Sequence, residues 1–203
     1  MAQKSPKYVG DAQTRSLLET FSCPVPFHAV RAQFMGNIAS PVLSVSPIHT
    51  IEEFWPDGLP VFENEEEANA LMEGLLSLWN HLAQHQKRNK PFKLIVKPFG
   101  DDRDEMREFL TVRTQEIDYF LEGLLDGDAQ FPIPDDIREE IALLAENYAL
   151  MNATLDLLDN VASTDQEISS LTSNLRELSK IAGIQINDII LACVRWRRKP
   201  TLH

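Results

Sequence analysis

Apolar side chains recur at alternating intervals of three and four residues over most of the chain after residue 64. This spacing places them on one face of an α-helix, because a helix has about 3.6 residues per turn. The stripes comprise Ala68, Leu71, Leu75, Leu78 and Leu82; Met106, Leu110, Arg113, Ile117, Phe120 and Leu124; Ile137, Ile141, Leu144, Tyr148, Met151, Leu155 and Leu158; and Ile168, Leu171, Leu175, Leu178 and Ala182. They predict long helices that each bury one face, and therefore an all-α, multi-helix bundle.

Capping residues indicate where the first two of these helices begin and where the second one ends. Asn64 is a good N-cap, and Glu67 stands three positions later, as in a capping box. Asp101 or Asp102 is positioned to cap the second helix, and Gly127 is positioned to end it.

The C-terminal part predicts an antiparallel helical hairpin followed by a short terminal helix. Pro134 suits the first turn of the third helix, and Thr164 with Glu167 forms a capping box for the fourth. The linker between these helices is short, so they are expected to pack antiparallel. Gly183 is expected to break the chain before a last helix over 186–196.

The first sixty residues are less regular. Residues 12–21 and 27–38 predict two short helices, while the prolines that follow exclude one long helix. Residues 92–97 are strand-like but have no obvious partner, and we interpret them as an extended connector. The Phe-Pro-Ile-Pro stretch near 130–134 predicts a boundary between a helical block, 1–130, and a second unit, 131–203, which holds the hairpin, the terminal helix and a basic tail.

Composition indicates an acidic protein of a reducing compartment. The 203 residues carry a formal net charge of −12, which disfavours nucleic acid and anionic lipid as partners. The two cysteines, Cys23 and Cys193, belong to no metal-binding or redox spacing. No window is apolar enough for a membrane span, so we expect a cytoplasmic location and no membrane partner.

Several motifs of the first block resemble those of one protein family. They are Ile38-Ala-Ser-Pro41, Pro47, Phe54-Trp55, Glu65-Glu-Glu-Ala68, the run from Leu75 to Leu82, and the run from Phe120 to Gly127. Over about residues 28–127 this set resembles the YecA/YgfB-like family of uncharacterised, all-helical bacterial proteins.

The match with that family is partial at its Trp-x-x-Gly-Phe-x-x-Gly motif. Gly123 and Gly127 match the two glycines, whereas Phe120 replaces the tryptophan and Leu124 the phenylalanine; Asn80 matches an asparagine upstream. Some members also carry a C-terminal Cys/His metal-binding tail, which this sequence lacks. The resemblance implies an all-helical fold and a regulatory or adaptor role, with no catalytic residues.

Two groups of side chains are candidate metal ligands. His81 and His85 are one helical turn apart, so both imidazoles could bind one metal ion. Asp101, Asp102, Asp104 and Glu105 could bind Mg²⁺ or Ca²⁺. We prefer simpler interpretations for both groups. The histidines lie on a solvated polar face of their helix, and the acids gather at a helix N-terminus because the helix dipole favours negative charge there.

Cationic side chains are the candidates for partner binding. Arg113 interrupts an apolar stripe, so it requires a carboxylate partner if buried and could bind an anion if exposed. The C-terminal cluster combines cations with an aromatic ring and comprises Arg195, Trp196, Arg197, Arg198 and Lys199. It could contact an acidic protein surface or nucleic acid, or simply complement a helix dipole. A turn centred on Gly183 is like that of a helix-turn-helix, although the following helix is too apolar to read bases.

Glycines inside two predicted helices indicate close helix packing. Gly74 and Gly123 each cost about 1 kcal/mol relative to alanine, which a close approach of another helix would offset.

No common catalytic or cofactor motif is present, and no cofactor is expected. The leading hypothesis is a non-enzymatic helical interaction protein, an adaptor or regulator that binds another macromolecule through a helical face; homodimerisation is left open. One alternative is a metal-dependent or small-ligand enzyme that uses His81, His85 and the acids from Asp101 to Glu105. Another is nucleic-acid binding through the basic tail.

Overall fold

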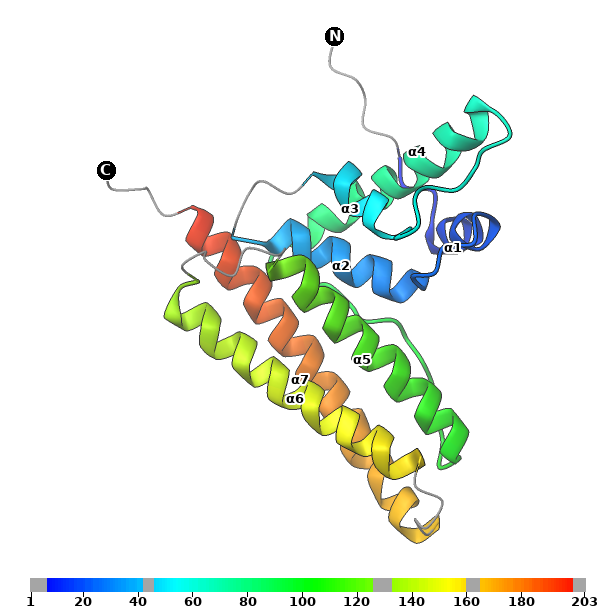
Figure 1. The fold of residues 1–203 in the computed structure, drawn as a ribbon. Helices are drawn as coiled ribbons and strands as arrows, with labels where there is room; N and C mark the ends of the chain where they lie inside the picture. Colours follow the sequence, from blue (N-terminus) through cyan, green and yellow to red (C-terminus); the bar gives the residue numbers. More distant parts are fainter. Residues whose placement is uncertain (1–6, 42–45, 126–132, 160–164, 199–203) are drawn as a thin grey trace.

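The chain folds into a bundle of helices, as the periodicity predicts (Figure 1). The computed structural model describes residues 7–41, 46–125, 133–159 and 165–198. Its helices are α1 (Asp11–Thr20), α2 (Phe27–Ala39), α3 (Pro47–Glu53), α4 (Glu65–Leu82), the short 3₁₀ helix η1 (Ala83–His85), α5 (Arg103–Leu125), α6 (Asp135–Asp159) and α7 (Asp165–Arg197). The described ranges contain no β-strand, so the prediction of an all-α fold is confirmed.

Helix α2 is buried along almost its whole length and packs against α5. The two helices meet through glycines. A Cβ atom at Gly36 would clash with Phe120 O and lie 2.7 Å from Leu124 N, and one at Gly123 would lie 3.0 Å from Asn37 N. The main chains of α2 and α5 are therefore in direct contact, which is the close approach that Gly123 predicts. Gly74 similarly faces another helix, since a Cβ there would meet a side-chain carbon of α1.

Three long helices, α5, α6 and α7, lie side by side and form the elongated part of the molecule (Figure 1). The predicted stripe of α5 is fully buried, including Arg113. Helix α6 packs along α7, and the side-chain amide of Asn147 in α6 donates a hydrogen bond to Leu178 O of α7 at 3.0 Å. The buried apolar residues of α6 repeat every seven positions: Ile137, Leu144, Met151 and Leu158.

Helix α7 is continuous where the sequence predicts two helices. Gly183 was expected to end one helix before another over 186–196, yet α7 runs without interruption through this position. The buried positions Ala182, Ile186 and Ile189 keep helical spacing on both sides of the glycine. Burial of this face outweighs the cost of about 1 kcal/mol for a glycine inside a helix. The prediction of a helix-turn-helix-like turn here is wrong.

The predicted N-caps of α4 and α5 are confirmed. Asn64 Oδ1 accepts a hydrogen bond from the Glu67 N–H at 2.9 Å. The Glu67 carboxylate accepts from the Glu63 N–H rather than from that of Asn64, so the capping box is displaced by one residue. Asp102, not Asp101, caps α5.

Several predictions fall on parts of the chain outside the described residues. Gly127 and Thr164 lie there, as does most of the expected boundary over 130–134. The boundary between the two blocks therefore stays a prediction. The two cysteines, Cys23 and Cys193, both lie in the described ranges and have free thiols. Among the helices of the described ranges, none combines the length and the apolar character that crossing a membrane requires.

Candidate functional site

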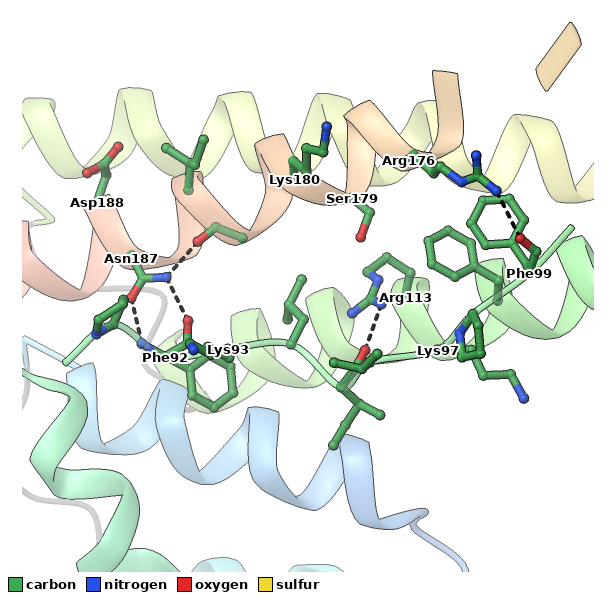
Figure 2. Close-up of a pocket in the computed structure, with 18 residues that line it drawn as sticks. Phe92, Lys93, Lys97, Phe99, Arg113, Arg176, Ser179, Lys180, Asn187 and Asp188 are labelled. Atoms are coloured by element: carbon green, nitrogen blue, oxygen red, sulfur yellow. Dashed lines mark hydrogen bonds between the residues drawn. The ribbon is translucent and has the colours of Figure 1, made fainter. Parts of the chain in front are cut away.

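An extended segment that contains the strand-like residues passes between α5 and α7 without a strand partner. This connector, residues 91–99, is neither helix nor strand, as predicted. It borders a cavity of about 950 Å³ whose other walls come from α5 and α7 (Figure 2). We call this cavity the connector groove; its volume lies within the range of about 300–1,000 Å³ typical of ligand-binding clefts. The residues that line it from the helices are Phe109, Arg113, Arg176, Ser179, Lys180, Gly183, Ile184, Asn187 and Asp188.

Side chains, rather than a neighbouring strand, satisfy part of the connector backbone. Asn187 of α7 bonds both polar groups of Phe92: its Oδ1 accepts from Phe92 N–H at 2.8 Å, and its Nδ2 donates to Phe92 O at 2.9 Å (Figure 2). The same Nδ2 donates to Gly183 O at 2.7 Å, which fixes the amide orientation. Asn187 therefore acts on Phe92 as the backbone of an adjacent strand would.

A buried ion pair on α5 does the same for Ile95. Glu116 Oε1 accepts from Ile95 N–H at 2.8 Å, and the Arg113 guanidinium donates to Ile95 O at 2.9 Å. Arg113 and Glu116 also form a salt bridge, with side chains 3% and 0% exposed. Arg113 therefore has the carboxylate partner that its burial requires.

The arginine–glutamate pair is strongly desolvated. Burial raises the pKa of Glu116 to about 7, against the opposing effects of the Arg113 charge and of the bond from Ile95 N–H. Burial likewise lowers the pKa of Arg113. Within the described residues, Arg113 Nε has no hydrogen-bond partner although it is buried. The pair thus fixes the connector at some electrostatic cost.

The connector has one backbone edge that no described residue occupies. In an extended chain, the N–H and C=O of successive residues point to opposite edges. Ile95 bonds to α5, so Leu94 and Val96 lie on the opposite backbone edge, together with Phe92, whose polar groups bond to Asn187 of α7. Among the described residues, no hydrogen bond involves the backbone of Leu94 or Val96. The Leu94 side chain extends toward α7, since its Cδ1 lies 3.9 Å from the position that a Cβ at Gly183 would take.

Among the charged side chains that line the connector groove, basic ones predominate. They are Lys93, Lys97, Arg113, Arg176 and Lys180, against the single acid Asp188. Two of the lysines also contact acids beside the groove, in pairs of Lys97 with Glu108 and Lys180 with Glu177. Such exposed pairs contribute little and can be exchanged. On a protein with net charge −12, this lining is a local basic region.

His81 and His85 lie next to each other, and each ring also has a partner of its own. The His81 ring stacks on Tyr8 with centroids 4.4 Å apart, and the two histidine rings meet edge to face. His85 Nδ1 donates to Lys90 O at 3.1 Å. Burial and the neighbouring His85 lower the pKa of His81. No group of three or more histidine, cysteine, aspartate or glutamate side chains within the described ranges is arranged to hold a metal ion.

The acids from Asp101 to Glu105 have separate local partners. Asp101 accepts from the Thr172 hydroxyl at 2.6 Å, and Asp102 caps α5. Asp104 pairs with Arg107, and Glu105 accepts from Gly100 N–H at 2.7 Å. Asp101 therefore joins the segment before α5 to α7, and the other three carboxylates bond at or near the start of α5.

The described C-terminal cations comprise one half-buried side chain and two exposed ones. Arg197 donates to Ile38 O at 2.9 Å and to Gln86 Oε1 at 2.5 Å, which ties the end of α7 to the end of α2. Trp196 packs against the core. Arg195 and Arg198 are exposed, and Lys199 lies outside the described residues.

The structure adds two cations that the sequence analysis missed. Lys87 and Arg88, in the loop after η1, line a pocket of about 320 Å³ together with Arg195 and Arg198. We call these four residues the basic cluster. Their separation along the chain, between positions 88 and 195, leaves no local pattern from which the cluster could have been predicted.

Comparison with known proteins finds no matching family model, no matching curated protein and no matching solved structure. The resemblance to the YecA/YgfB-like family therefore stays a prediction.

Proposed function

We propose that the protein is a non-enzymatic adaptor or regulator that binds a segment of a partner protein in the connector groove. The observation that carries this proposal is that the backbone groups of Leu94 and Val96, two residues that line the groove, form no hydrogen bond with any described residue. Addition of an extended peptide to such an edge is a common mode of peptide recognition.

The lining of the groove indicates which peptides fit. Main-chain hydrogen bonds to Leu94 and Val96 provide binding without regard to sequence, and pockets for alternate side chains provide selectivity. Exposed Ile184 and half-buried Phe99 offer apolar surface, and the basic lining favours a carboxylate. The expected ligand is an extended, acidic segment with apolar residues at alternate positions.

Selection from a displayed random-peptide library tests the proposal. Peptides selected on the wild-type protein should be acidic. They should bind about tenfold more weakly to a variant with Lys93→Glu and Lys180→Glu, because two cations of the groove become acids. A matched control, Lys87→Glu with Arg88→Glu, changes the charge equally outside the groove and should bind the peptides as the wild type does.

The backbone contribution has its own test. Methylation of alternate peptide nitrogens removes the donors that would pair with the connector edge, so it should abolish binding in one register and leave it intact in the other. Equal binding of both methylated forms, or equal weakening by the control variant, would contradict the proposal.

A second candidate function is nucleic-acid binding through the basic cluster, because the fold joins Lys87 and Arg88 to the C-terminal cations. Fluorescence anisotropy with labelled single-stranded DNA should then show an affinity that falls steeply with salt. Substitution of Arg195 and Arg198 by alanine should reduce both the affinity and the salt dependence, whereas Arg197 is left intact because it bonds to the core. Binding that is insensitive to salt would exclude this function.

A further inference from the structure

Three leucines of α6 lie at the surface at intervals of seven residues. Leu143, Leu150 and Leu157 are 48%, 56% and 52% exposed. Exposed leucines are ordinary when single, but a heptad repeat places these on one side of the helix. We call them the leucine stripe. Helix α6 thus carries two heptad stripes, and only the one that includes Leu144 faces the core.

The leucine stripe borders the seam between α6 and α7. Asn147 marks the side of α6 that faces α7, because its amide donates to Leu178 O and to Gln185 Oε1, at 3.0 Å and 3.2 Å. The first two leucines of the stripe stand one turn before and one turn after Asn147, so they lie on this side. Ile181, between the two α7 residues that Asn147 contacts, is 38% exposed. Apolar side chains from two adjacent helices therefore line one outer surface.

Acidic residues flank this surface. Glu139 and Glu146 lie one turn on either side of Leu143 and are exposed. Glu177 precedes Ile181 by one turn on α7, with its side chain 63% exposed; it forms an exposed ion pair with Lys180, which a partner's cation can replace. In coiled coils, charges beside an apolar seam select the partner helix by complementarity.

The charge of α6 argues against a second copy of this chain as the occupant. Helix α6 contains seven acids and a single arginine. Two α6 helices packed together would place like charges against each other, which is unfavourable. A helix with lysine or arginine at its flanking positions would form attractive pairs instead.

We propose that the leucine stripe is the docking site for a basic amphipathic helix of a partner protein. Apolar residues of that helix would pack on the stripe and Ile181, and its cations would pair with the flanking glutamates. This surface is formed by α6 and α7, whereas the connector groove is formed by the connector, α5 and α7. The inference therefore stands independently of the proposed function and gives the protein a second partner-binding surface.

The test uses a synthetic helical peptide of three heptads, with leucine at positions a and d and lysine at the flanking positions. The variant carries Leu143→Glu and Leu150→Glu, and the control carries Ile48→Glu and Val61→Glu, whose side chains are 49% and 98% exposed in the wild type. Both variants gain the same negative charge. Calorimetry should show binding about tenfold weaker for the stripe variant, because apolar contact is lost, and unchanged or slightly tighter binding for the control.

Two outcomes would overturn the inference. If the stripe variant binds the lysine-rich peptide as tightly as the control does, attraction between net charges explains the binding and the stripe has no role. If sedimentation shows that the wild type is a dimer and the stripe variant a monomer, the occupant is a second copy. A milder pair of substitutions, Leu143→Gln with Leu150→Gln, keeps the test valid if circular dichroism shows that the glutamate variant is unfolded.

Discussion

At Gly36 and Gly123, a hydrogen atom stands where any other residue would place a carbon against the main chain of another helix. Main-chain atoms cannot rotate away as a side chain can, so a substitution there requires the helices to separate. Both positions are therefore expected to tolerate no side chain without a shift of one helix.

We expect Gly36→Ala to reduce the free energy of unfolding by about 3 kcal/mol, as overpacked cores do. Urea denaturation followed by circular dichroism measures this loss. Gly74→Ala is the matched control, because the atom that its Cβ would meet is the flexible tip of Leu17 and alanine favours the helix. A loss at Gly36 no larger than at Gly74 would show that α2 and α5 are not in main-chain contact.

Glu116 makes the stability depend on pH. Its pKa is about 7 in the folded protein, above its ordinary value of 4.5, because burial disfavours the carboxylate. The folded state therefore binds the proton more tightly than the unfolded state does. The resulting contribution to the free energy of unfolding is fully present below pH 4.5 and is lost as the pH rises through 7.

We expect the wild type to lose on the order of 3 kcal/mol of stability between pH 4.5 and pH 7, relative to Glu116→Gln. Denaturation of both proteins across this range measures the difference. The control Glu177→Gln, on an exposed glutamate, should follow the wild type. Parallel pH profiles of the wild type and Glu116→Gln would show that the pKa of Glu116 is not raised.

At the scale of elements, the continuity of α7 through Gly183 has a direct consequence. A Cβ at Gly183 would meet only Leu94 Cδ1, at 3.9 Å, which is ordinary van der Waals contact. We therefore expect Gly183→Ala to stabilise the protein by up to about 1 kcal/mol, since alanine is the better helix former. A rise in the thermal midpoint would confirm this. If the chain turned at this residue, as the sequence predicts, alanine would destabilise it instead.

Local pattern explains which elements could be predicted. Helices α1, α2, α4, α5 and α6 were predicted because a buried helical stripe or a short apolar run is visible in consecutive residues. Helix α3 was missed, since the seven residues of Pro47–Glu53 are too few to show a stripe. The glycine inside α7 is a local breaker whose effect is overridden by packing along the whole helix.

The site could be predicted only in part, because its key contacts join distant residues. The extended state of the connector and the need of Arg113 for a carboxylate followed from composition and burial. The choice of Glu116 and Ile95 as its partners depends on how α5 lies against the connector. Asn187 bonds to Phe92 across 95 positions, and an asparagine in an apolar helix carries no pattern that identifies such a partner.

At the scale of the whole molecule, α7 links the first block to the second. It contacts α2, α5 and α6, and Arg197 bonds to the last turn of α2. The buried residues of both blocks belong to one hydrophobic core. We therefore expect a single cooperative unfolding transition.

Two probes can test this expectation in a Trp196→Phe variant. Fluorescence then reports only Trp55 and Trp79 of the first block, while far-ultraviolet circular dichroism reports helices throughout the chain. The two denaturation curves should coincide. Separate midpoints would indicate that the predicted blocks 1–130 and 131–203 unfold as independent domains.

The contact between the main chains at Gly36 and Gly123 also sets the alignment of two arginines that hold the connector. Arg31 of α2 lies 3.4 Å from Lys93 O, and Arg113 of α5 bonds to Ile95 O, two residues further along. Any change in the distance between α2 and α5 would move these two anchor points relative to each other. A related chain with a bulkier residue at either glycine would consequently need a compensating change in the connector, or its groove would have a different width.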